Sequence, residues 1–215
     1  MLAELRTASR VAATAADTLE VAIEVALDAA LLSTTRPPAM TEDEIAIIKL
    51  YTMEITPRES SFYARVNETL RAEQREQVKP WVPCIWLLMH ALKKCPRPEG
   101  SLVFRGVKED LSGMFKKDSR ITWPSFSSCT SSMDLLSSSA FLGYVGPRTM
   151  FTIELTQGRA RLVSALSMIP GEDEVLLPPN SRFTVVSVLG PSADGRLDVH
   201  LREIRPLDPI LSFDP

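Results

Sequence analysis

The chain has 215 residues, of which 45% are hydrophobic and 24% are charged, and its formal net charge is -3 at pH 7. This composition is ordinary for a globular protein, and the slight negative charge gives no electrostatic basis for binding nucleic acid or an anionic membrane. The sequence contains no run of about 18 uninterrupted apolar residues, which argues against a transmembrane helix. We therefore expect neither binding to nucleic acid nor stable insertion into a membrane.

Cysteine and histidine are both rare in this chain. The three cysteines, Cys84, Cys95 and Cys129, match neither a metal-binding spacing nor a disulfide framework. We expect reduced thiols in a cytosolic-type chain, and an extracellular protein with one disulfide is the alternative. The two histidines, His90 and His200, are far apart in sequence, so no metal site is predicted. The N-terminus also lacks the basic start and compact apolar middle of a secretory signal.

The first 33 residues are rich in alanine and leucine and predict one or two helices. Apolar residues follow helical spacing at Val21, Val25, Ala29 and Leu32. A helix that packs on the main domain is the simpler interpretation, and a helix that binds a partner, a chaperone or a membrane surface is the alternative. Paired prolines end the segment. We predict a helical extension over residues 1–40, followed by a main domain over residues 41–215.

Three further helices follow. Thr41 and Glu44 form a capping box, which marks the start of a helix that ends before Pro57. The next helix is predicted over 60–77, with a strongly charged outer face, and the last over 81–94. The helices of the main domain thus occupy residues 41–95.

The pattern changes to strands at residue 101. Alternating or short apolar runs predict strands at 102–105, 121–126, 149–155, 160–165, 175–177, 182–189 and 197–204. These form a β core over 101–205, and a proline-punctuated tail follows over 206–215. Because helices come first and strands afterwards, the sequence predicts an α+β fold and not a parallel α/β sheet.

An arginine lies inside the first apolar strand. Arg105 is followed at once by Gly106. A guanidinium offers a fork of donors that suits a phosphate or a carboxylate, and glycine lets a ligand approach the backbone closely. A buried arginine paired with a structural carboxylate explains the pattern equally well.

A run of hydroxyl side chains follows Phe126, in Ser127-Ser128-Cys129-Thr130. Hydroxyls at the end of a strand can position a neighbouring carboxylate by hydrogen bonding. A serine- and threonine-rich loop is the simpler interpretation of this run by itself. The sequence contains no nucleophile elbow, phosphate-binding loop, dinucleotide motif or zinc motif.

Two glutamates, Glu172 and Glu174, flank Asp173 directly before an apolar run. At strand spacing, side chains at i and i+2 point to the same face, so these carboxylates would project side by side. Such a pair is unfavourable unless a cationic substrate or a developing positive charge interacts with it.

In this order, the three motifs resemble the arginine–serine–glutamate clan of mono-ADP-ribosyltransferases, over roughly residues 45–204. That family has an arginine at the end of the first core strand, an aromatic–x–Ser–Thr–Ser strand and a Glu-x-Glu before a later strand. The helical half resembles its eukaryotic-type and bacterial-effector members at Tyr51, Thr52, Tyr63, Asn67 and Arg71. The resemblance implies a helical lobe packed on a mixed or antiparallel two-sheet β core, with a cleft for NAD.

The resemblance also implies how NAD is bound. Arg105 would hold the phosphates of NAD, and the backbone of Gly106 would face the nicotinamide amide. Phe141 would stack on the nicotinamide ring, and Thr130 would support the site. NAD is thus expected as a substrate, and no metal is expected.

The two glutamates receive separate roles by the same resemblance. Ser128 would orient Glu174, which would bind the 2′-hydroxyl of the nicotinamide ribose and stabilise an oxocarbenium-like transition state. Glu172 would receive and activate the attacking side chain, which in this family goes with arginine as the acceptor. The expected reaction is transfer of ADP-ribose from NAD to a target protein. An NAD glycohydrolase, a transferase with another acceptor and an inactive NAD-binding module are the alternatives.

Two positions depart from the family pattern. Cys129 replaces threonine within the triplet, and its side chain should point away from Ser128 and Thr130, with little effect on chemistry. Ile169 stands where family members often have an aromatic residue that recognises the target, so the target protein stays open. We expect a monomer that acts as a bacterial effector or toxin inside a host cell, and a cellular eukaryotic-type enzyme is the rival interpretation.

Overall fold

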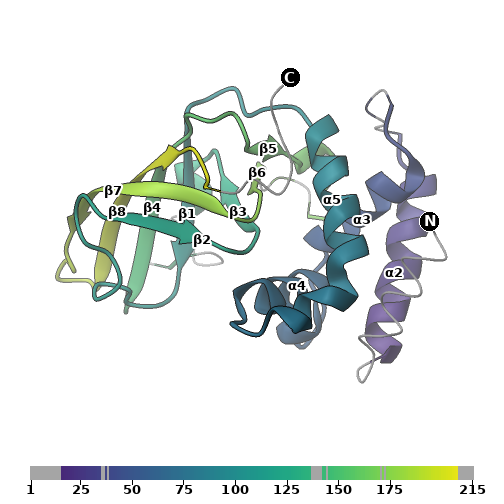
Figure 1. Cartoon of the computed structure of the whole chain (residues 1–215), viewed down its shortest axis with the longest axis horizontal. Coiled ribbons are helices and arrows are strands. Elements are labelled where there is room, and N and C mark those ends of the chain that lie inside the picture. Colours follow the sequence, from purple (N-terminus) through teal and green to yellow (C-terminus); the bar gives the residue numbers. More distant parts are fainter. Residues whose placement is uncertain are drawn as a thin grey trace. The chain divides into compact units, whose positions relative to one another are not determined.

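A computed structural model describes residues 16–34, 37, 39–136, 142–143, 145–169, 171 and 173–207. The chain divides into two compact units (Figure 1). The helical unit comprises Met1–Pro96 together with Val163–Gly171, and the β unit comprises Arg97–Leu162 and Glu172–Pro215. The segment Val163–Gly171 leaves the β unit, joins the helical unit and returns.

The helical unit is built from four α-helices among its described residues: α2 Ala16–Leu31, α3 Glu42–Thr52, α4 Phe62–Arg71 and α5 Val82–Lys94. Short 3-10 helices add η1 Arg58–Ser60, η2 Arg75–Trp81 and η3 Ser164–Leu166. Helix α3 is central, because α2, α4 and α5 all contact it. Among the helices that the structure describes, none has the length and apolar character needed to cross a membrane.

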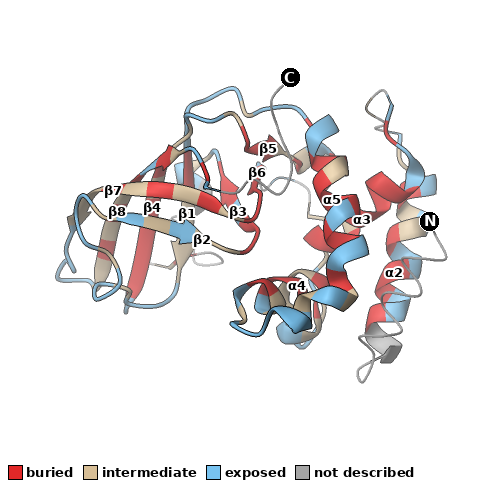
Figure 2. Cartoon of the chain, viewed as in Figure 1, coloured by how far each residue is buried: buried red, intermediate tan, exposed pale blue. Residues whose placement is uncertain are grey.

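Helix α2 packs on α3, as the simpler sequence interpretation predicted, but through a different face. The buried face consists of Leu19, Ala22, Ile23, Ala26 and Ala30, which recur at helical spacing. The predicted apolar stripe lies outward instead, with Val21 60% and Leu32 82% exposed. Three of the buried residues are alanines, whose small side chains let two helix backbones approach closely. Figure 2 shows buried residues in red and exposed residues in pale blue along α2.

Local signals set the start of α3 and the end of α4. The capping box is confirmed, since the Thr41 N–H donates to Glu44 Oε2 at 2.8 Å and the Glu44 N–H donates back to Thr41 Oγ1 at 3.3 Å. The predicted end of the next helix at residue 77 is wrong, because α4 stops at Arg71. Arg75 Nη1 donates to the carbonyl oxygen of Leu70 at 3.2 Å, so a side chain occupies an acceptor that a continuing helix would need.

The β unit contains β1 Leu102–Val107, β2 Arg120–Trp123, β3 Ser127–Thr130, β4 Arg148–Glu154, β5 Arg161–Leu162, β6 Glu174–Leu177, β7 Ser181–Leu189, β8 Arg196–Ile204 and the short helix α6 Met133–Leu136. In the described residues the strands form one eight-stranded sheet, in the order β2-β7-β8-β4-β1-β3-β6-β5. Strands β4 and β8 run parallel, and the other pairs are antiparallel. The predicted α+β class with a mixed sheet is confirmed.

The two sheets expected from the sequence form one continuous sheet with two limbs. One limb contains β2, β7, β8, β4 and β1, and the other contains β3, β6 and β5. The limbs meet where β1 pairs with β3, through the single register pair Phe104↔Thr130. One core fills the space between them, with buried side chains from both limbs, among them Val103, Cys129, Val175, Phe183 and Leu201. The limbs are hydrogen-bonded to each other because β1 pairs with β4 along one edge and with β3 along the other.

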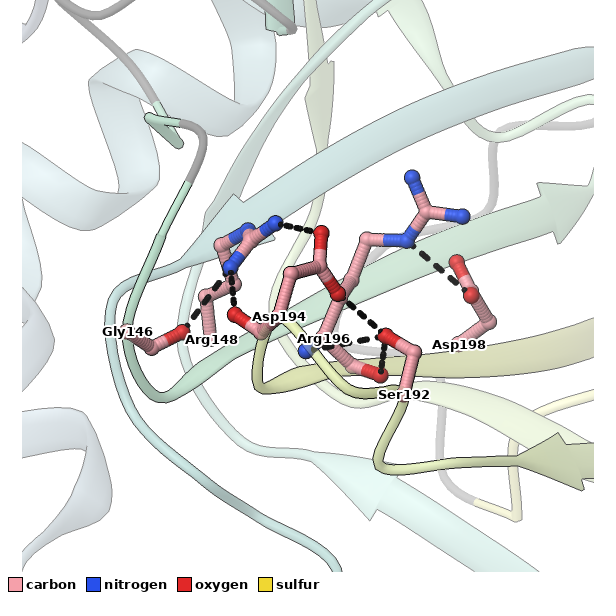
Figure 3. Close-up of polar contacts among 6 residues, drawn as sticks. All are labelled: Gly146, Arg148, Ser192, Asp194, Arg196 and Asp198. Atoms are coloured by element: carbon pink, nitrogen blue, oxygen red, sulfur yellow. Dashed lines mark hydrogen bonds and ion pairs between the residues drawn. The ribbon is translucent and has the colours of Figure 1, made fainter.

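A buried arginine fixes the hairpin between β7 and β8 (Figure 3). Arg148 Nη1 donates to the carbonyls of Gly146 at 2.9 Å and Asp194 at 2.6 Å, and Nη2 pairs with the Asp194 carboxylate at 2.5 Å. The Ser192 hydroxyl and the Arg148 guanidinium lower the pKa of Asp194 to about 2. Gly195 has a φ of +84°, and a Cβ there would lie 2.7 Å from the Gly146 oxygen, so this close approach requires glycine.

Candidate active site

Ser128 and Glu174 meet across the pair of strands β3 and β6. The antiparallel register places Thr130 opposite Glu174 and Ser128 opposite Leu176, so Ser128 and Glu174 are diagonal neighbours on one face. Ser128 Oγ donates to Glu174 Oε1 at 2.8 Å. The glutamate is only 6% exposed, which means that its carboxylate is largely removed from water. A serine hydroxyl therefore sets the orientation of a buried carboxylate.

Arg105 contacts the same serine from β1. Its Nη1 donates to the Ser128 carbonyl oxygen at 2.6 Å. The guanidinium forms no ion pair with a carboxylate in the part of the chain that the structure describes, so the structural pairing considered from the sequence is not observed. Ser128 thus connects Arg105, through its carbonyl, to Glu174, through its hydroxyl. We call this series the Arg105–Ser128–Glu174 relay.

Cys129 points into the protein core, as predicted. It belongs to the same buried cluster as Val103 and Val175, on the opposite face of β3 from the Ser128 hydroxyl. Burial is the largest cause that raises the pKa of its thiol to about 12. The thiol is therefore protonated at neutral pH and is neither a nucleophile nor a metal ligand there.

Two further predicted residues lie beside the relay. Thr130 is buried, and its Oγ1 accepts a hydrogen bond from the Ser132 N–H at 3.1 Å, which shapes the turn after β3. Gly106 lies in β1 opposite Met150, directly after Arg105. Both therefore belong to the strands that hold the relay.

The turn before β6 changes one premise of the sequence interpretation. Asp173 has a φ of +42° and Gly171 a φ of +93°, and β6 begins only at Glu174. The backbone between the two glutamates is thus not extended, so strand alternation does not determine where the Glu172 side chain points. Glu172 itself lies outside the described residues. The Asp173 carbonyl accepts a hydrogen bond from the Ser131 N–H at 3.4 Å, which ties this turn to the end of β3.

The predicted nicotinamide-stacking residue Phe141 also lies outside the described residues. Its neighbour Leu142 is buried with Phe104 and Met150 in a small cluster. Phe104 pairs with Thr130, so this cluster lies on the sheet face that carries Thr130. Leu142 therefore lies on the sheet face that carries Thr130, Ser128 and Glu174.

Sequence reasoning missed one contact of the segment that precedes β6. The Met168 N–H donates to Thr52 Oγ1 at 2.9 Å, across 116 residues of sequence. In the sequence, Thr52 belongs to the segment that resembles the helical half of the family, and no local pattern links it to Met168.

In the described residues, no group of three or more His, Cys, Asp or Glu side chains could hold a metal ion.

A helical unit, a mixed sheet and a relay of arginine, serine and glutamate are together the features of an ADP-ribosyltransferase. The family model described as NAD:arginine ADP-ribosyltransferase matches residues 7–206. Because the match covers nearly the whole chain, the chain belongs to the NAD:arginine ADP-ribosyltransferase family.

A curated protein that is similar in sequence has a name that matches this family. The curated protein named NAD(+)--arginine ADP-ribosyltransferase Mav, from Mycobacterium avium (strain 104), is 36% identical over 118 residues, which is 54% of this chain. The match covers only 14% of the length of that protein.

Solved structures show the same fold at lower identity. The eukaryotic mono-ADP-ribosyltransferase ART2.2 has a TM-score of 0.65 at 18% identity, covering 90% of this chain and 80% of that chain. Vis, an ADP-ribosyltransferase from Vibrio splendidus solved in complex with agmatine, has a TM-score of 0.60 at 18% identity and covers 86% of both chains.

Proposed function

We propose that this protein transfers ADP-ribose from NAD to an arginine side chain of a target protein and releases nicotinamide. The observation that carries the proposal is the Arg105–Ser128–Glu174 relay in a chain of the NAD:arginine ADP-ribosyltransferase family. Each member of the relay has a task in this reaction that matches its chemistry.

Glu174 stabilises the cation that forms when nicotinamide leaves. The bond between the ribose carbon and the ring nitrogen breaks, and its electron pair goes to nicotinamide, which becomes neutral. Positive charge then develops on the ribose, where a fixed carboxylate at low exposure interacts with it strongly. The hydrogen bond from Ser128 supports this role, because it holds the carboxylate by Oε1 in a defined orientation.

Arg105 binds the phosphates of NAD in this proposal. Its guanidinium has five N–H donors, and the hydrogen bond to the Ser128 carbonyl accounts for one of them. Gly106 presents its backbone to the nicotinamide amide, and Phe141 stacks on the ring. Thr130 supports the turn after β3, beside Glu174.

Glu172 accepts a proton from the attacking guanidinium, so that a neutral nitrogen forms the new bond to the ribose carbon. Arginine as the acceptor is supported by the family description. It is also supported by Vis, which has the same fold and binds agmatine, a small molecule with a guanidinium head group.

We further propose that the target is a protein of a host cell and that the enzyme acts as a monomeric effector. The support is the similarity in fold to Vis, which is described as a toxin. Mass spectrometry of a cell lysate incubated with the enzyme and NAD would identify both the target protein and the modified side chain. Modification of residues other than arginine would contradict the proposed acceptor.

The proposed reaction is tested with purified protein, NAD and agmatine, by measuring nicotinamide release and ADP-ribosyl-agmatine separately. We expect wild type to form both products and Glu172→Gln to lose transfer while it still hydrolyses NAD. If the protein is an NAD glycohydrolase, wild type and Glu172→Gln would both release nicotinamide, and neither would modify agmatine. Binding of NAD with no nicotinamide release would identify an inactive binding module and would refute the proposal.

A further inference from the structure

The segment Val163–Gly171 connects β5 to β6 but belongs to the helical unit. It begins with η3, where the backbone N–H groups of Leu166 and Ser167 both donate to the Val163 carbonyl, at 2.8 Å and 2.9 Å. Val163 and Leu166 are almost completely buried, at 1% and 2% exposure. The segment is thus a folded part of the helical unit, and it ends immediately before the two glutamates.

Thr52 holds this segment by its hydroxyl. It is the last residue of α3 and is 7% exposed. Its Oγ1 can donate to the carbonyls of Ile48 and Lys49, both at 3.1 Å, and it accepts from the Met168 N–H at 2.9 Å. A hydroxyl can donate and accept at once, so serine could replace threonine here, whereas valine has the same shape but could do neither.

We propose that Thr52 is a positioning residue for the acceptor side chain. It fixes the backbone at Met168, directly before Ile169 and four residues before Glu172 in the sequence. No residue from Val163 to Gly171 carries a charge, so Glu172 is the first carboxylate that follows the anchored backbone in the sequence. The inference rests on the proposed function, because it concerns how the acceptor reaches Glu172.

The effect is specific to the acceptor and does not extend to NAD cleavage. The Arg105–Ser128–Glu174 relay lies entirely in the β unit, and neither Thr52 nor Met168 contributes a hydrogen bond to it. Loss of the Thr52 hydroxyl therefore releases the segment before Glu172 and leaves the relay intact. Transfer and hydrolysis should separate.

The test compares Thr52→Val and Thr52→Ser in the full chain with Thr69→Val as the matched control. The Thr69 hydroxyl donates to Val66 within α4, at 2.9 Å, and has no contact with the segment. We expect Thr52→Val to raise the KM for agmatine about 3- to 10-fold, the range for one neutral hydrogen bond, with NAD hydrolysis unchanged. Thr52→Ser and Thr69→Val should keep the KM of wild type.

Hydrogen exchange measures the contact independently of activity. The peptide that contains Met168 should exchange faster in Thr52→Val than in Thr52→Ser or Thr69→Val. Equal agmatine KM in the two valine variants, or an equal fall of transfer and hydrolysis in Thr52→Val, would overturn the inference. A wild type that releases no nicotinamide would refute the proposed function and the acceptor role with it, while exchange would still report whether Thr52 holds the segment.

Discussion

Two glutamates of the β unit are buried to a similar extent but have different partners. Glu174 is 6% exposed and accepts a hydrogen bond from the Ser128 side chain. Glu203, in β8, is 1% exposed and accepts from the backbone N–H groups of Thr156 and Gln157, at 3.1 Å and 2.9 Å. Backbone donors bind Glu203 to a loop, whereas a side-chain donor orients Glu174 at the start of a strand.

The electrostatics of Glu203 also indicate a structural role. Burial raises the pKa of this carboxyl, and the hydrogen bonds from Gln157 and Thr156 and the charges of Arg159 and Arg161 partly oppose the rise. Its surroundings thus offset part of the cost of burying this carboxylate. The comparison teaches that burial of a carboxylate does not by itself mark an active site.

The largest effect is expected from Glu174→Gln. The substitution keeps the size of the side chain but removes the charge that would stabilise the ribose cation, so nicotinamide release should fall by about 10²–10³-fold. Thermal stability should change little, because the Ser128 hydroxyl can still donate to the amide oxygen. Nicotinamide release near the wild-type rate would show that the carboxylate does not act in the reaction.

Glu203→Ala should show the opposite behaviour. The backbone N–H groups of Thr156 and Gln157 would lose their acceptor, and the buried Arg159 and Arg161 would lose a compensating charge. We expect the free energy of unfolding to fall by about 3 kcal/mol, measured by chemical denaturation. Activity per folded molecule should remain at the wild-type level, and a selective loss of turnover without loss of stability would erase the distinction between the two glutamates.

Ser128→Ala sharpens the comparison at the donor. The variant keeps the backbone carbonyl that binds Arg105 but removes the hydroxyl that orients Glu174. We expect the kcat for nicotinamide release to fall about tenfold, the effect of one hydrogen bond to a charged group. Ser127→Ala is a neighbouring control on the same strand, and an equal loss in both variants would argue against orientation by Ser128.

The smallest effect is expected at the cysteines, which are all buried and free. Burial raises the pKa of the Cys84 thiol to about 11 and the pKa of the Cys129 thiol to about 12. Native protein should therefore resist maleimide at pH 7 and keep its activity, whereas protein in denaturant should react at all three thiols. Rapid native labelling of Cys129 with loss of activity would place this thiol at the site and not in the core.

Features encoded by neighbouring residues were predictable from the sequence. The capping box of Thr41 and Glu44 involves residues one helical turn apart, and the alternating patterns of β4, β7 and β8 are local too. The order of motifs also singled out Arg105, Ser128 and Glu174. The structure connects these three residues by hydrogen bonds, and their roles in the reaction stay predictions.

Features that depend on distant residues were not predictable. Apolar residues occur on both faces of α2, so spacing did not show which face α3 would cover. The end of α4 is a local feature that was also missed, because the contact of the Arg75 side chain with the Leu70 carbonyl is not part of any helix pattern. The joining of the two limbs at Phe104 and Thr130 and the hydrogen bond between Thr52 and Met168 both require the chain to be folded first.

The left-handed backbone at Asp173 restricts which sequences can separate the two glutamates. With a φ of +42°, this position suits glycine, asparagine and aspartate, and it is strained for β-branched residues. A library randomised at this codon should therefore retain activity mainly with those three residues and lose it with valine or isoleucine. The Glu172-Asp173-Glu174 motif thus specifies a turn as well as two carboxylates. The backbone conformation restricts its middle residue, although that residue has no role in the proposed chemistry.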